Sequence, residues 1–291
     1  MTDSARARRE RRERRAYTSH ERPLFFAHRG GALLAPENTL AAFDRGVALG
    51  ADALELDIQM TSDGELVVIH DTTVDRTTSG AGPVSAYTLG ELRRLDAGYR
   101  FTPDDGASFP FRGQGLIIPT LREVFVRYPT LRVNIDLKES TPERERRLWA
   151  LIQEQHAEER VLVASGDLHE PIVRFRQISA GRVATSASER EIRFFLFAAW
   201  AGVARVLRPP YDALQVPETW RGVRVVSPRV IAAAHRLGLD LHVWTVDARA
   251  DMDRLLAWGV DGLMSDRPDL LAQALGRPGG AAGLDSEAAS G

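Results

Sequence analysis

Short apolar segments alternate with amphipathic ones along most of the chain. Eight of the apolar segments have the length of a buried strand, and several intervals between them carry apolar residues at helical spacing. Strands that alternate with helices in this way predict an α/β fold, and eight such units predict a (β/α)8 barrel, or TIM barrel. The predicted barrel strands are residues 24–28, 52–58, 131–138, 160–165, 182–185, 212–216, 239–246 and 261–265.

Helical segments follow most of these strands. Residues 40–49 have amphipathic spacing with Gly50 just beyond them, which is typical of a helix end. Thr120 and Glu123 have the spacing of a capping box and predict a helix that begins after Thr120. Further helices are predicted at residues 144–157, 169–178, 227–237 and 251–258.

A tight turn follows the second predicted strand. Asp63-Gly64 is typical of a two-residue hairpin loop, because Gly accepts the positive φ that such a turn needs. With these two residues as the loop, the register places Asp57 directly opposite His70. Glu55 is two residues from Asp57 and therefore shares its face. The hairpin predicts a cluster of two carboxylates and one imidazole, and the return strand is an excursion from the barrel.

Residues 72–117 are too long for an ordinary loop between a strand and a helix. They are rich in Gly, Pro, Thr and Asp, with one helical piece around residues 88–95. We therefore predict a small inserted subdomain after the second strand, over one end of the barrel. The barrel as a whole is assigned to residues 23–275, between disordered tails at 1–22 and 276–291.

Polar residues gather at the predicted carboxyl ends of the barrel strands. In barrel enzymes the catalytic residues lie at that face, whereas residues with structural roles have no reason to sort to it. The pattern therefore predicts an enzyme. The residues concerned are His28, Arg29, Glu55, Asp57, Asp136, Lys138, Ser165, Trp244 and Ser265.

Three of these residues suit a hard metal cation. Glu55, Asp57 and Asp136 all lie on strands of mainly apolar sequence, where a carboxylate needs a cation or a hydrogen-bonded partner. Oxygen ligands favour Mg²⁺ or Ca²⁺. A single carboxylate in a strand is usually a solvated edge residue, so the prediction depends on the three occurring together.

The remaining polar residues suit chemistry on an anion. Arg29 and Lys138 would attract a negatively charged substrate, and His28 and His70 offer a general acid and a general base near neutral pH. Lys138 is the only lysine beside 37 arginines, so either a compact ammonium is needed there or one surface lysine has survived by chance. With a bound cation, this set suits phosphodiester cleavage.

Charge and composition exclude several classes of protein. The 291-residue chain has a net charge of −2; its first 23 residues hold eight Arg and four acidic residues, about +4, so the remainder carries about −6. An acidic body argues against a nucleic-acid groove. The absence of cysteine excludes disulfides and thiolate metal sites. Without a secretory signal we expect a cytoplasmic protein, and no sequence feature decides its oligomeric state.

Several short motifs, in order and at suitable spacing, make the chain resemble the glycerophosphodiester phosphodiesterase family from about residue 24 to about residue 275. The set is specific, although each motif alone is weak. The motifs are HRG at 28–30, PENT at 36–39, ELD at 55–57, HD at 70–71, IDLK at 135–138, VWTVD at 243–247 and DGLMSDRP at 261–268.

The resemblance implies a barrel enzyme of glycerol and lipid metabolism that hydrolyses glycerophosphodiesters to glycerol 3-phosphate and an alcohol. It implies His28 and His70 as the acid–base pair, with Arg29 and Lys138 on the substrate phosphate. Two alternatives stay open: a lysophospholipase D-like activity on lipids with one acyl chain, and a barrel that binds phosphoesters without turnover. The intact histidines and carboxylates argue against the second alternative.

The resemblance also implies a divalent cation, Mg²⁺ or Ca²⁺, held by Glu55, Asp57 and the carboxylate at 136. The family usually has Glu where this chain has Asp136, so direct ligation and a bridging water are both open. Glu37 is expected to support the metal site, and Asn38 beside it also suits a helix cap.

Two further residues are expected in the substrate pocket. Trp244, at the upper end of its strand, would form a wall of the glycerol pocket. Ser165 is followed by Gly166 where the family often has Phe, which would open one wall of the alcohol pocket.

Residues 194–207 are apolar on every side as far as Arg205. The run is too short to span a bilayer, which needs about 20 apolar residues. One interpretation is a buried helix between the barrel and its neighbours. The other is a peripheral membrane contact near the barrel mouth, with Phe195, Phe197 and Trp200 exposed.

Overall fold

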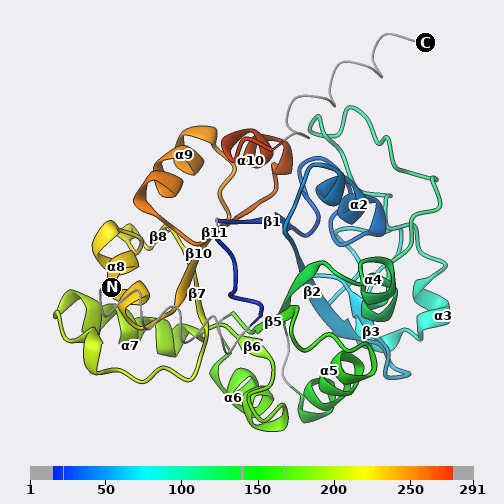
Figure 1. The fold of residues 1–291 in the computed structure, drawn as a ribbon. Coiled ribbons are helices and arrows are strands. Elements are labelled where there is room, and N and C mark those ends of the chain that lie inside the picture. The colour runs from blue at the N-terminus through cyan, green and yellow to red at the C-terminus, as the bar shows by residue number, and fades with distance from the viewer. Residues whose placement is uncertain (1–15, 22, 139–140, 167, 278–291) are drawn as a thin grey trace.

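The computed structural model describes residues 16–21, 23–138, 141–166 and 168–277, and these form a ring of parallel strands surrounded by helices (Figure 1). The strands follow one another around the ring in the order β6-β5-β4-β2-β1-β11-β10-β7. A parallel bridge between Ser186 and Ala213 joins β6 to β7, so the ring of eight strands is nearly closed. This confirms the predicted TIM barrel.

All eight predicted barrel strands are present. They are buried on both faces, because their inner side chains fill the barrel and their outer side chains pack under the helices. The strands are β1 (Leu24–His28), β2 (Ala53–Met60), β4 (Arg132–Leu137), β5 (Val161–Ala164), β6 (Ala184–Thr185), β7 (Ala213–Pro217), β10 (Asp240–Trp244) and β11 (Gly262–Ser265).

The surrounding helices begin at capping residues that the sequence supplies. Thr120 and Glu123 form the predicted capping box. The helix predicted at 144–157 instead runs from Pro142 to Glu154, because Thr141 caps it and Pro suits its first position. The helices outside the insertion are α2 (Leu40–Ala48), α4 (Leu121–Arg127), α5 (Pro142–Glu154), α6 (His169–Ile178), α7 (Glu189–Trp200), α8 (Pro228–Arg236), α9 (Arg249–Trp258) and α10 (Pro268–Ala274).

The predicted hairpin exists, but its register is wrong by one residue. Strand β3 (Leu66–Val68) pairs with β2 so that Ile58 faces Val68. Thr61 N–H donates to Glu65 O at 3.0 Å, which leaves a loop of three residues that ends at Gly64 with φ +83°. Three-residue hairpin loops with a left-handed final residue are the next most common kind after two-residue loops. Asp57 consequently lies opposite Ile69, and His70 follows the end of β3.

The inserted segment packs over β3 and has a small core of its own. It contains a short 3-10 helix η1 (Val84–Ala86) and the helix α3 (Leu89–Leu92). Thr88 and Glu91 form a capping box at the start of α3. Its core is separate from the main one and consists of Val67, Ile69, Val74, Val84, Leu92, Ala97 and Ile118.

Residues 16–21, which we assigned to the N-terminal tail, pack against the start of the barrel strands. Tyr17 is buried in the cluster that fills the barrel, and Arg132, at the beginning of β4, donates to its carbonyl at 2.9 Å. His20 Nε2 lies 2.9 Å from Asp240 Oδ2, at the beginning of β10. The rest of the predicted N-terminal tail, and residues 278–291 of the C-terminal one, lie outside the described residues.

The apolar run at 194–207 proves to have two different faces. Phe195, Leu196, Ala198 and Ala199 are buried, as the first interpretation expected. Phe197 is 69% exposed and Trp200 47% exposed, as the second expected, although it was wrong about Phe195. Within the described chain, we find no helix with the length and apolar character needed to cross a bilayer.

Candidate active site

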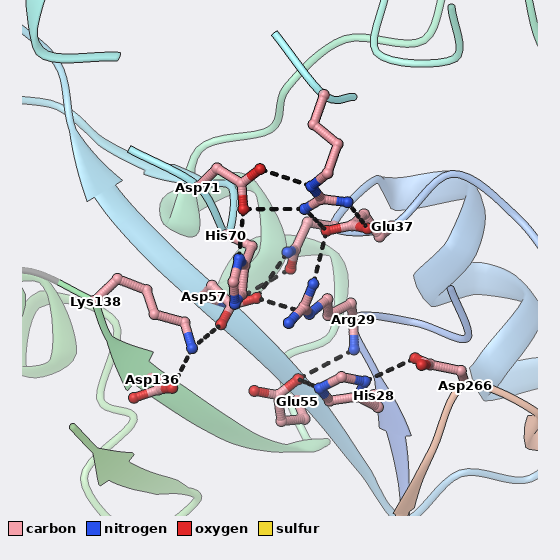
Figure 2. A network of polar contacts seen from close by, with 12 residues as sticks. His28, Arg29, Glu37, Glu55, Asp57, His70, Asp71, Asp136, Lys138 and Asp266 are labelled. Atoms are coloured by element: carbon pink, nitrogen blue, oxygen red, sulfur yellow. Dashed lines mark hydrogen bonds and ion pairs between the residues drawn. The ribbon is translucent and has the colours of Figure 1, made fainter. Parts of the chain in front are cut away.

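A cavity of about 490 Å³ opens at the carboxyl ends of the barrel strands. Its lining draws on all eight barrel strands or the loops that follow them, and on α7. Eight of the ten predicted site residues line it. They are His28, Arg29, Glu55, His70, Asp136, Lys138, Ser165 and Trp244. The other two, Asp57 and Glu37, do not line it, but both contact Arg29, which does (Figure 2).

His28 stands at the end of β1 between two carboxylates. Its Nδ1 lies 2.7 Å from Asp266 Oδ1, and its Nε2 lies 3.7 Å from Glu55 Oε2. Burial by itself would lower the pKa of His28, but Glu55 and Asp266 outweigh it and raise that pKa above its usual value. The Asp266 contact fixes the ring, because the nitrogen it binds cannot turn toward the cavity.

His70 is held in the same way by the residue that follows it. Its Nδ1 lies 2.6 Å from Asp71 Oδ1, and Arg76 Nε donates to Asp71 Oδ2 at 2.6 Å. Burial would raise the pKa of Asp71, but hydrogen bonds from Arg76 and His70 lower it to about 2. Asp71 is therefore ionised at neutral pH and is a constant acceptor for the His70 ring.

Arg76 links this pair to the first strand. It binds Glu37 with two hydrogen bonds of 2.6 and 2.8 Å, and Arg29 Nη1 donates to the same carboxylate at 3.0 Å (Figure 2). Burial would raise the pKa of Glu37, and the two guanidinium groups lower it. Both carboxylate oxygens of Glu37 therefore accept hydrogen bonds from arginines. The bond to Arg29 positions that guanidinium group.

Asp57 lies at the centre of the charged cluster and is almost completely buried. Asn38 Nδ2 donates to its Oδ2 at 2.9 Å, Arg29 Nε lies 3.3 Å from Oδ2, and Lys138 Nζ lies 3.1 Å from Oδ1. Burial would raise the pKa of Asp57, but Lys138 and Arg29 lower it. Lys138 also donates to Asp136 Oδ2 at 2.6 Å, so it bridges the two aspartates.

The pKa of Glu55 is shifted in the opposite direction from that of Asp57. Glu55 is buried, and its Oε2 accepts the Arg29 backbone N–H at 3.1 Å. Burial and the negative charge of Asp57 raise the pKa of Glu55 to about 7. The site therefore carries more carboxylate than its own cations neutralise.

The residues present fit a divalent cation. Asp136 Oδ1 is a buried oxygen without a hydrogen-bond donor, Asp57 Oδ1 has only its ion pair with Lys138, and Glu55 offers a third carboxylate on the cavity wall. Hard cations take such oxygens. Asp57 and Asp136 face each other across the β2–β4 ladder, which sets their carboxylates side by side.

The predicted pocket residues occupy opposite walls. Ser165 Oγ donates to Leu168 O at 2.6 Å, so this hydroxyl is used within its own loop. Gly166 has φ +42°, and a Cβ there would lie 3.9 Å from Asp136 Oδ2. The glycine leaves Asp136 open to the cavity. Trp244, at the end of β10, is partly exposed across the cavity.

Sequence reasoning gave no role to three residues of the site. Asp266 and Asp71 lie in quoted motifs, at or beside the carboxyl ends of strands, and that position was the available signal. Arg76 lies in the insertion and has no local signal. Asn38 suits a helix cap by its sequence position, but Thr39 is the N-cap of α2, and Asn38 donates a hydrogen bond to Asp57 instead.

A different group of candidate ligands lies at the other end of the barrel. Within the described part of the chain, His20, Asp240 and His242 are the one group whose ligand atoms all lie within 4.8 Å of one another. None of the three lines the cavity. They cannot serve a cation that acts beside His28 and His70.

The sequence matches the Glycerophosphoryl diester phosphodiesterase family over residues 28–270. A glycerophosphodiester phosphodiesterase of Caldanaerobacter subterraneus subsp. tengcongensis is 38% identical over 88% of this chain and 99% of its own. One from Bacillus subtilis is 33% identical over 87% and 86%.

Among solved structures, a glycerophosphodiester phosphodiesterase from Agrobacterium tumefaciens superposes with a TM-score of 0.69 at 29% identity. The match covers 86% of this chain and 99% of that one. Barrel, cavity and sequence matches agree, and the chain therefore belongs to the glycerophosphoryl diester phosphodiesterase family of phosphoric diester hydrolases.

Proposed function

We propose that the enzyme hydrolyses glycerophosphodiesters to glycerol 3-phosphate and an alcohol with the help of a divalent cation, and that His28 and His70 transfer the protons. The observation that carries the proposal is that a carboxylate orients each of the two histidine rings in the same way. Each ring has its Nδ1 on a carboxylate, and both rings line one cavity with Arg29 and Lys138.

The two imidazoles suit the two proton transfers of the reaction. One takes a proton from the attacking oxygen, which belongs either to water or to the 2-hydroxyl of the substrate's own glycerol. The other gives a proton to the oxygen of the leaving alcohol as its bond to phosphorus breaks. Asp266 and Asp71 hold the rings in a fixed orientation, so neither has to be ordered when the substrate binds.

Arg29 and Lys138 suit the phosphate. Arg29 is fixed by Glu37 and Asp57, and Lys138 by Asp57 and Asp136. Their positive charges would offset the charge that develops on the phosphoryl oxygens. The space between the two aspartates admits the compact ammonium of Lys138, which supports a specific reason for the only lysine of the chain.

Glu55, Asp57 and Asp136 are the residues that would hold the cation. A bound Mg²⁺ or Ca²⁺ would polarise a phosphoryl oxygen and orient the substrate. Asp136 is one methylene shorter than Glu, and the open backbone at Gly166 leaves room for water beside its carboxylate.

A lysophospholipase D-like activity is the second candidate, and one feature of the cavity favours it. On the side of α7 the lining includes three apolar residues, Ile192, Leu196 and Val225, beside Glu189 and Arg193. This wall would accept an acyl chain beside the glycerol group. A binding barrel without turnover has no use for two oriented imidazoles.

The test is the release of glycerol 3-phosphate from glycerophosphocholine, measured with and without a chelator and after Mg²⁺ or Ca²⁺ is restored. His28→Asn and His70→Asn should each lower turnover by roughly 10²–10⁴-fold. The exposed His156 has a left-handed backbone that Asn tolerates, so His156→Asn is the matched control and should keep full activity. Unchanged turnover in a folded His28 or His70 variant would contradict the proposal.

A further inference from the structure

We propose that the side of the barrel mouth next to α7 docks on the surface of a bilayer that contains anionic phospholipid. We call this face the aromatic rim. It consists of α7 and the residues after it as far as Arg208, which include the 3-10 helix η2 (Ala204–Val206), and of a hairpin, β8 (Thr219–Trp220) and β9 (Val223–Arg224). Figure 1 shows α7 and β8 on the same side of the barrel.

The outer face of α7 carries large apolar side chains where a surface helix normally carries polar ones. Phe194 is 64% exposed and Phe197 is 69% exposed, and they lie three residues apart on one face. Val203 and Val206, which follow the helix, are also exposed apolar residues. The opposite face of α7 already packs on the core through Phe195 and Ala199, so the outer aromatics face solvent and not the core.

The hairpin adds a second exposed apolar pair. Trp220 and Val223 face each other across the turn at Arg221 and Gly222, and all four strand residues are exposed. A lone two-stranded hairpin is only marginally stable in water. Tryptophan with one apolar and one polar edge is enriched where protein meets the interface of a bilayer.

Arginines surround these apolar side chains. Residues 189–208 and 219–224 hold six Arg and two Glu, in a chain whose net charge is −2. Glu191 is neutralised by Arg176, which lies outside the rim, so only Glu189 offsets the arginines. The six arginines are exposed: Arg190, Arg193, Arg205, Arg208, Arg221 and Arg224.

This charge selects the partner. Apolar side chains among arginines are complementary to a surface of apolar chains beneath anionic headgroups. A second copy of the chain is disfavoured, because a symmetric contact would bring two sets of six arginines together. Outside the rim and the Arg-rich first 23 residues, the chain is strongly acidic and would be repelled by such a surface, which favours docking through the rim.

The aromatic rim borders the cavity. Ile192, Arg193 and Leu196 on the inner side of α7, and Trp220 on the hairpin, line the cavity that holds His28 and His70. Docking would therefore bring the mouth of the cavity close to the bilayer, where a lysophospholipid, the substrate of the second candidate activity, is held by its acyl chain. This consequence for substrate supply rests on the proposed function, whereas the docking itself does not.

The test is co-sedimentation of the full chain with phosphatidylcholine vesicles, with and without phosphatidylglycerol. We expect binding only to the anionic vesicles, weakened by salt, and reduced at least roughly tenfold in Phe194→Ser/Phe197→Ser because two inserting aromatics are lost. Val206→Ser should weaken binding. Val126→Ser is its matched control, since Val126 is equally exposed on α4, outside the rim, and should bind normally.

Glycerophosphocholine turnover, measured on the same samples, should be unchanged in all of these variants, since none of the residues lines the cavity. This separates failure of docking from failure of the proposed function. Absence of binding to either kind of vesicle would overturn the inference. Concentration-dependent dimerisation in sedimentation velocity, lost in Phe194→Ser/Phe197→Ser, would overturn it in favour of a second copy.

Discussion

His242 should make the barrel lose stability as the pH falls from about 6.5 to about 4. Its ring is fully buried in β10, where Nδ1 lies 3.3 Å from Gln215 Nε2 and Nε2 has no hydrogen-bond partner. Burial lowers the pKa of His242 to about 4, although Asp240 and Asp261 act to raise it. His20, on the other side of Asp240, acts with burial to lower it.

The sign follows from where the proton binds. Between pH 6.5 and pH 4 the unfolded chain takes up a proton on this ring and the folded protein does not, so the free energy of unfolding decreases as the pH falls. With a pKa near 6.5 in the unfolded chain and about 4 in the folded protein, this ring contributes on the order of 3 kcal/mol, most of which should be lost between pH 7.5 and pH 4.5.

The measurement is urea unfolding of the wild type and of His242→Gln at several pH values. Gln can pair with Gln215 and does not titrate, so the variant should start less stable and lose roughly 2–3 kcal/mol less over this range. Other groups, including His28, titrate in both proteins and cancel in the difference. Parallel stability curves for the two proteins would refute the reasoning, because they would mean that the ring is already protonated or is solvated in the folded state.

Three further predictions concern the active site. Asp71→Asn and Asp266→Asn should each lower kcat by roughly 10²-fold or more while the KM changes little, because the amide leaves the ring in the wrong tautomer; steady-state kinetics with both parameters decides this. Lys138→Arg keeps the charge but should lose most of its glycerophosphocholine turnover, because a planar guanidinium does not fit between Asp57 and Asp136. Full turnover in this variant would mean that the only lysine of the chain has no specific role. Glu55→Gln and Asp136→Asn should weaken Mg²⁺ or Ca²⁺ binding in calorimetric titrations, and an unchanged affinity in Asp136→Asn would mean that this carboxylate acts through water or not at all.

The sequence by itself determined the barrel and most of the site, because both depend on local patterns. Each strand is a short run of apolar residues, and the strand count set the fold. Once the strands point the same way, their carboxyl ends must meet at one face, so His28, Glu55, Asp136 and Trp244 could be grouped without knowledge of any contact.

The tertiary structure decided what depends on backbone conformation and on distant partners. The hairpin register turned on whether two or three residues form the loop, and Asp63-Gly64 is compatible with both. Asp266 reaches His28 across 238 residues, and Arg76 reaches Glu37 from the insertion, so no local pattern indicated either pair.

Residues 194–207 show the same limit at the level of a helix face. Periodicity identifies the buried side of a helix only when the other side is polar. In α7 both sides are apolar, so the sequence could not say that Phe195 packs on the core while Phe197 meets solvent. That choice depends on which face of α7 is turned toward its neighbours, α6 and α8 among them, and only the packed structure decides it.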